Sequence, residues 1–146
     1  MSSADACPCG RTGSFGRLDY ASCCGRFLDG GADAPDAQAL MRSRYTAYAL
    51  RRNDYLLATW DPAHRPDTLD DSAGTTWLGL EVLDHQVLDG DHAEVEFIAR
   101  FRAATGPARA LRERSRFVRR DGRWLYLDAV TPRTAPPTGG GRAGAG

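Results

Sequence analysis

The chain has 146 residues, enough for one domain of ordinary size and a small appendage. Its 19 basic and 19 acidic side chains cancel, so the net charge gives no general attraction to nucleic acid or to an anionic membrane. No segment approaches the roughly 20 apolar residues that cross a bilayer, and the first residues lack the basic and apolar parts of a secretory signal. We therefore expect a cytoplasmic protein without membrane contacts.

All four cysteines lie in residues 1–30, as two close pairs: Cys7 with Cys9, and Cys23 with Cys24. Two such pairs are typical of a tetrahedral structural zinc site. Four thiolates would leave no coordination position for a substrate, so the zinc would be structural. Disulfides would need an oxidising compartment, and Cys-x-Cys is a weaker redox motif than Cys-x-x-Cys. We predict a zinc knuckle over residues 1–30, with redox chemistry and free thiols as the open alternatives.

The turn-rich segment Leu28–Pro35 is expected to be a linker between this knuckle and a main domain over residues 36–131. Asp36 can cap a helix that runs to about Arg51, because apolar residues recur at threes and fours behind it. A shorter helix is expected to start at Asn53 or Asp54.

Residues 61–75 are predicted to form a polar loop, with one helical turn near Asp67–Asp71. From Thr76 the apolar period changes to two, which indicates strands. The expected strands are Trp77–Leu88, Ala93–Arg102, Ala110–Arg120 and Arg123–Val130. The tail, residues 132–146, is rich in proline and glycine and is predicted to be disordered.

A hairpin turn is predicted at Asp121-Gly122, since both positions tolerate positive φ. A regular register from this turn pairs Phe117 with Tyr126 and Ser115 with Asp128. Helices followed by an antiparallel sheet predict an α+β domain whose curved sheet wraps its helices.

One face of the predicted hairpin mixes acidic, hydroxyl and aromatic side chains, and it would line a ligand cavity if it faced inward. Glu113 and Asp128 would then lie close enough to provide an acid and a base, with Tyr126 or Tyr45 as hydrogen-bond donor. The alternative is that Glu113 pairs with an arginine, such as Arg44 or Arg114, and that Ser115 and Asp128 form a cross-strand hydrogen bond.

The opposite face is rich in arginine: residues 100–123 contain nine arginines against two acidic residues. Such a stripe could bind RNA phosphates. Glu94 and Glu96 on the neighbouring strand would neutralise part of it, so a solvated face is the alternative.

The sequence resembles the YchJ-like bacterial family from about residue 5 to residue 130. The resemblance lies in Cys7-Pro-Cys-Gly10, Cys23-Cys-Gly25, Leu40–Tyr48, Asp54–Trp60, Trp77–Leu83, Val95–Phe97 and Glu113–Val118. It implies an N-terminal SEC-C zinc motif, with the four cysteines as ligands, joined to a nuclear transport factor 2-like domain, a cone of helices on a curved sheet. Two features depart from the family: the loop Gly10–Ser22 is longer than usual, and Arg112 replaces a frequent histidine.

The fold implied by this resemblance hosts enzymes, binding modules and scaffolds alike. The leading interpretation is a zinc-stabilised, non-catalytic adaptor or binding module whose knuckle contacts a protein or ribosomal partner, by analogy with the SEC-C motif of the protein-export motor. The alternative is a small-molecule enzyme, of isomerase, cyclase or hydrolase type, that uses the cone pocket with Glu113 and Asp128. RNA binding by the arginine-rich face comes third.

Overall fold

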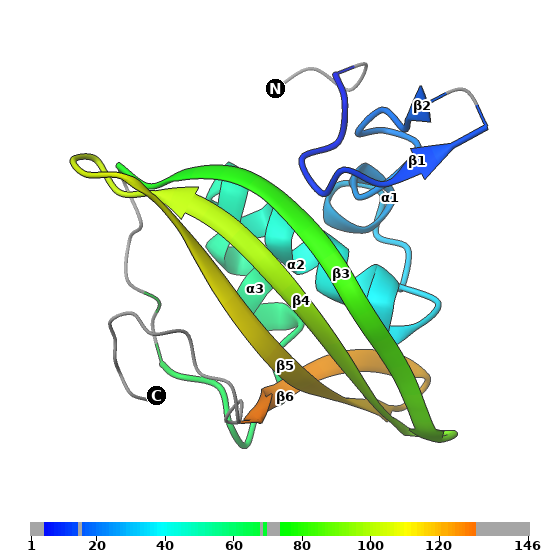
Figure 1. Ribbon diagram of the computed structural model, residues 1–146. Coiled ribbons are helices and arrows are strands. Elements are labelled where there is room, and N and C mark those ends of the chain that lie inside the picture. The colour runs from blue at the N-terminus through cyan, green and yellow to red at the C-terminus, as the bar shows by residue number, and fades with distance from the viewer. Residues whose placement is uncertain (1–4, 15, 68, 70–73, 131–146) are drawn as a thin grey trace.

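The computed structural model describes residues 5–14, 16–67, 69 and 74–130. The first elements are a small hairpin of two strands and three helices: β1 (Thr12–Gly13), β2 (Gly16–Arg17), α1 (Gly25–Leu28), α2 (Ala37–Leu50) and α3 (Asn53–Ala58). Four longer strands follow: β3 (Thr76–Asp89), β4 (His92–Arg102), β5 (Ala108–Arg120) and β6 (Arg123–Val130). Figure 1 shows the four as a curved sheet with α2 and α3 on one side, and with α1 and the β1–β2 hairpin grouped near the N-terminus.

The sheet is an antiparallel meander in which the strand order follows the chain, β3-β4-β5-β6. Strand β4 alternates as its sequence predicts, because Ala93, Val95, Phe97 and Ala99 are buried while their neighbours are less so. The predicted α+β class, a curved antiparallel sheet packed on N-terminal helices, is confirmed.

Local signals set both ends of α2. The Asp36 carboxylate accepts a hydrogen bond from the Ala39 amide at 2.7 Å, as expected of an N-cap. At the other end, Arg51 adopts a left-handed conformation with φ 60° and stops the helix. The predicted bounds of this helix are therefore confirmed.

The β5–β6 hairpin corrects one predicted register. Asp121 and Gly122 have φ values of 53° and 77°, and the pairing of Phe117 with Tyr126 is confirmed. A bulge follows, however: Arg116 pairs with Asp128, so that Leu127 has no partner opposite it. The predicted pairing of Ser115 with Asp128 is wrong, because one extra residue turns every later side chain of β6 to the other face.

Helix α2 is buried on more than one side. Its sheet-facing side chains include Met41 and Tyr45, whereas Thr46, also fully buried, contacts the cysteine segment. The knuckle and the main domain thus share one buried cluster rather than standing apart, although residues 29–36 join them as a short irregular segment.

The expected helical turn near Asp67–Asp71 rests largely on residues outside those described, and so does the expected disorder of residues 132–146. In the described part of the chain, no helix is both long enough and apolar enough to span a bilayer.

Candidate metal centre and cavity

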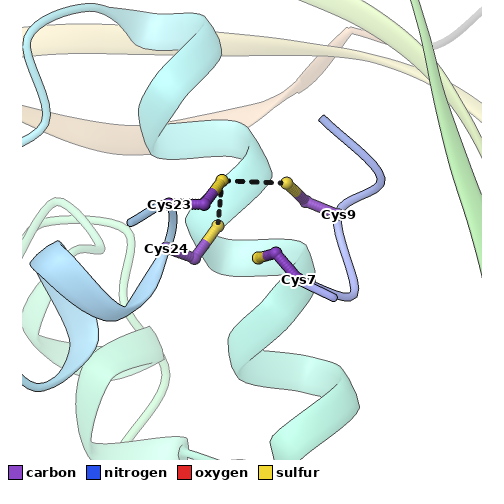
Figure 2. Close-up of side chains that lie close together, drawn as sticks. All are labelled: Cys7, Cys9, Cys23 and Cys24. Carbon is purple, nitrogen blue, oxygen red and sulfur yellow. Dashed lines mark hydrogen bonds between the residues drawn. The ribbon is translucent and has the colours of Figure 1, made fainter. Parts of the chain in front are cut away.

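The four cysteines come together in one buried group. Their sulfur atoms all lie within 4.8 Å of one another, and each residue is at most 2% exposed. Cys9 Sγ is 3.6 Å from Cys23 Sγ, which is 4.0 Å from Cys24 Sγ. Figure 2 shows the four side chains converging from two chain segments beside α2. Such a group of sulfurs can hold one metal ion.

Short backbone bonds shape each of these two segments. The Cys7 amide donates to the Leu18 carbonyl at 2.9 Å, and the Gly10 amide donates to the Cys7 carbonyl at 3.1 Å. Gly10 has a φ of 77°, which a residue with a Cβ adopts only with strain. The second pair of cysteines opens α1, in which the Leu28 amide donates to the Cys24 carbonyl.

Three arginines donate hydrogen bonds to carbonyl groups of the cysteines themselves. Arg17 reaches the Cys7 carbonyl at 2.9 Å, Arg26 the Cys23 carbonyl at 2.9 Å, and Arg42 of α2 the Cys9 carbonyl at 3.1 Å. These side chains thus orient the backbone that carries the cysteines and place positive charge around the sulfurs.

The thiols influence one another's ionisation. Hydrogen bonds from Cys23 and Cys24 lower the pKa of Cys7 and bring that of Cys9 to about 7. The pKa of Cys24 is raised, first by its hydrogen bond with Cys23. Four thiolates at this spacing repel one another, so a cation is needed to ionise them all.

A cavity of about 300 Å³ lies between α2 and the sheet. Its wall is largely aromatic, with rings from Tyr45, Tyr48, Trp60, Trp77, Phe117 and Tyr126. Trp77 packs on both Tyr45 and Tyr48, with ring centroids 5.6 and 5.8 Å apart, and Trp60 packs edge-on to Tyr126 at 5.1 Å. The predicted inward face of the hairpin therefore does line a cavity, as a ligand site requires.

Glu113 lies in this wall, as expected, but it forms no ion pair with Arg44 or Arg114, the arginines expected to neutralise it. Ser115 donates to Glu113 Oε2 at 2.7 Å, and the Tyr126 hydroxyl lies 3.5 Å from the same oxygen. Within the described chain no arginine or histidine forms an ion pair with Glu113. Burial and then the Glu113 charge raise the pKa of Tyr126, so its hydroxyl stays protonated.

Arg44 is the second charged group of the cavity, and it is only 5% exposed. Its Nη1 donates to the Leu56 carbonyl and to Thr59 Oγ1, both at 2.8 Å. The guanidinium lies 4.6 Å from the Tyr126 ring centroid and 5.1 Å from that of Trp60.

From the sequence, Arg44 was considered only as an ionic partner for Glu113. The signal for its position was the stripe of α2 residues that face the sheet, in which Arg44 follows Leu40 and precedes Tyr48 at intervals of four.

Asp128 does not join Glu113. The bulge at Leu127 turns Asp128 to the outer face, where Arg116 binds its carboxylate through two nitrogen atoms and lowers its pKa. The expected acid and base pair is thus absent, since its two members lie on opposite faces of the sheet.

The outer face is neutralised across the strands. Arg112 pairs with Glu96, and Arg114 contacts Glu94, Glu96 and Asp84. Seven of the nine arginines in residues 100–123 have an acidic partner: Arg100, Arg112, Arg114, Arg116, Arg119, Arg120 and Arg123. The pattern favours a solvated, ion-paired face over a phosphate-binding one.

Comparison of the sequence with known proteins gives consistent matches. A profile described as "YchJ, middle NTF2-like domain" matches residues 36–129. A UPF0225 protein from Polaromonas sp. (strain JS666 / ATCC BAA-500) is 56% identical over 128 residues, which are 86% of this chain and 92% of the relative. A UPF0225 protein from Xanthomonas campestris pv. campestris (strain 8004) is 52% identical over 127 residues, 86% and 94% of the two chains.

Two solved structures have the same fold. The solution structure of a SEC-C motif containing protein from Rhodopseudomonas palustris has a TM-score of 0.74 at 39% identity, and the match covers 86% of this chain and 98% of that one. The crystal structure of a SEC-C motif containing protein from Psychrobacter arcticus has a TM-score of 0.73 at 35% identity, and the match covers 86% and 82%.

Proposed function

Because this chain belongs to the YchJ family of UPF0225 proteins, we propose that it is a cytoplasmic, non-catalytic binding module stabilised by one structural zinc ion. The observation that carries the proposal is the closed group of four buried sulfurs. A metal inside such a group has no open coordination position for a substrate, whereas catalytic zinc sites keep one.

The spacing of the sulfurs fits zinc. A tetrahedron with Zn–S bonds of about 2.3 Å has edges of about 3.8 Å, and two of the sulfur–sulfur distances here are 3.6 and 4.0 Å. Thiolates are soft ligands, which favours Zn²⁺ over Mg²⁺ or Ca²⁺. Cys7, Cys9, Cys23 and Cys24 would hold the ion, which would join the two cysteine segments of the knuckle to each other beside α2.

Native mass spectrometry of anaerobically purified protein tests the zinc. We expect one zinc ion per chain, lost on treatment with a strong chelator, and none in a Cys7→Ser/Cys23→Ser variant. Protein that carries no metal, or that carries a disulfide, would contradict the proposal.

The β1–β2 hairpin is the part of the knuckle best placed to contact a protein or ribosomal partner. Its described residues are exposed, including Arg11 and Arg17, while its base is tied to the cysteine carbonyls. The metal would thus hold an exposed loop in one conformation, and a preformed loop binds with a smaller entropic cost.

A pull-down with three proteins tests the partner. We expect the wild type to retain a partner that the Cys7→Ser/Cys23→Ser variant loses. An Arg11→Glu variant is the matched comparison for the cysteine variant, since it alters the surface of the hairpin while leaving the four sulfurs in place. Retention by the cysteine variant would show that the knuckle has no part in binding.

A further inference from the structure

The described residues around the cavity provide one charge of each sign and a largely aromatic wall, and nothing in the proposed role of the knuckle uses this cavity. Arg44 is buried at the α2 side, and Glu113 lies on β5 opposite. In the described chain, neither side chain forms an ion pair, and burial lowers the pKa of Arg44. A ligand that carries net charge of either sign would therefore meet one like charge at short range.

The cavity also has two donors that lack acceptors. The indole Nε1 atoms of Trp60 and Trp77 are buried and make no hydrogen bond within the described chain. Both indoles belong to the cavity wall. A buried donor without an acceptor is costly and is normally satisfied by water or by a ligand. Because both nitrogen atoms are buried, a ligand oxygen reaches them only after the surrounding rings move.

Glu113 offers the complementary chemistry. Ser115 occupies one of its oxygen atoms at 2.7 Å, and a carboxylate has about four acceptor sites. It can therefore accept further N–H or O–H groups from a ligand. The rings around it would stack on a flat molecule, as aromatic pairs prefer.

We propose that this cavity binds a neutral, planar heteroaromatic lactam, a ring that carries an N–H donor beside a carbonyl acceptor. The N–H bonds to Glu113, the carbonyl faces the Arg44 side, and the ring lies among the aromatic side chains. A volume of about 300 Å³ is at the lower end for ligand sites, so one or two fused rings fit.

The three tryptophans allow a direct test by NMR on the full, zinc-loaded chain labelled with ¹⁵N. Indole N–H resonances of Trp60 and Trp77 report on the cavity, whereas Trp124, which lies outside this cavity wall, is the internal control. Single Trp→Phe variants assign the three signals. The probes are quinazolin-4(3H)-one, a neutral bicyclic lactam; quinoline, which lacks the lactam; and 2-naphthoate, an aromatic anion.

We expect quinazolin-4(3H)-one to shift the Trp60 and Trp77 signals, to leave Trp124 unchanged, and to bind at least tenfold more tightly than the other two probes. No shift at millimolar probe would overturn the proposal. Equal binding of quinoline would reduce the site to an apolar cavity, and tighter binding of 2-naphthoate would assign it to aromatic acids; either result refutes the lactam.

Variants separate recognition from folding. Glu113→Gln should weaken quinazolin-4(3H)-one about tenfold while the Trp124 signal stays in place. Asp128→Asn, the same change on the opposite face, should leave affinity unchanged. Leu111→Trp is a second test of ligand binding. Leu111 lines the cavity yet is 39% exposed, so a larger side chain at this position should block entry of the ligand without disturbing the core. Undiminished binding in both Glu113→Gln and Leu111→Trp would overturn the proposal.

Discussion

The side chains that surround the sulfurs are as much a part of the proposed metal site as the cysteines themselves. Arg42 stands out among the three arginines that donate to cysteine carbonyls, because it comes from α2 and so connects the main domain to the ligand loop. A zinc ion with four thiolates carries a net charge of −2, and hydrogen bonds from cationic groups offset such charge.

Arg42→Gln is expected to weaken zinc binding, because the glutamine is neutral and too short to reach the Cys9 carbonyl in the same way. Loss of comparable outer contacts lowers metal affinity about 10- to 100-fold. Competition with a chromogenic chelator measures the change. Arg11→Gln is the control, since it removes the same charge from an exposed position in the knuckle; an equal effect of both variants would show that charge alone matters.

Asp61 is a second residue whose environment leads to a measurable effect. It is 2% exposed, its carboxylate accepts from His64 Nδ1 at 2.9 Å and from Arg120 Nε at 2.8 Å, and its amide donates to the Tyr126 carbonyl. The bonds from His64 and Arg120 lower its pKa. A carboxyl group with a lowered folded-state pKa stabilises the fold above its unfolded pKa of about 4, and this contribution is lost as the pH falls through the folded value.

Asp61→Asn should therefore lower the free energy of unfolding by about 1–3 kcal/mol at pH 7, and by less below pH 4. Urea unfolding of both proteins at each pH gives the difference. A deficit that stays constant between pH 7 and pH 3 would mean that the Asp61 charge does not contribute.

At the scale of single elements, the decisive feature is the bulge in β6. In a regular strand, Asp128 would lie on the cavity side with Ser115. Because Leu127 is unpaired, Asp128 instead lies on the outer face, where it binds Arg116. Among the described residues that line the cavity, Glu113 is consequently the single carboxylate. The outer face in turn gains one more acidic partner for its arginines, and the same cross-strand pairing neutralises Arg112 and Arg114.

This pairing predicts weak affinity for nucleic acid. The wild type should show no binding to a uridine 20-mer at physiological salt, because its phosphates would have to displace Glu94 and Glu96 from the arginines. A Glu94→Gln/Glu96→Gln variant should bind measurably at low salt and weaken steeply as salt rises. Fluorescence anisotropy measures both, and tight, salt-sensitive binding by the wild type would restore the RNA interpretation.

At the scale of the whole molecule, α2 is shared by two parts of the chain. One side of the helix packs on the sheet, and Thr46 contacts Cys7 on another, with Sγ and Oγ1 3.7 Å apart. Arg52 adds bonds from beyond the helix to Asp29 and to the Leu28 carbonyl. The knuckle therefore covers part of the core, and its order affects the domain beneath it.

Removal of the metal should destabilise the whole described chain. Structural zinc contributes about 10 kcal/mol or more of apparent binding energy in small peptides, and its loss exposes the cysteines and the α2 side chains under them. We expect a chelator to lower the melting temperature. Near-ultraviolet circular dichroism, which reports on the packing of the aromatic cavity, measures this temperature. If only the knuckle loses its amide protection while the melting temperature holds, the two parts are energetically separate.

The sequence by itself determined the features that depend on near neighbours: the cysteine pairs, the Asp36 cap, the Asp121-Gly122 turn and the alternation of β4. Each rests on a spacing or a backbone preference within a few residues. Only the tertiary structure decided the place of Asp128 and Arg44 and the packing of the knuckle on α2. A one-residue bulge inverts the face of every later side chain, and the buried Arg44 depends on the Leu56 carbonyl of α3 and on the Thr59 hydroxyl at its end, so neither can be derived from local pattern.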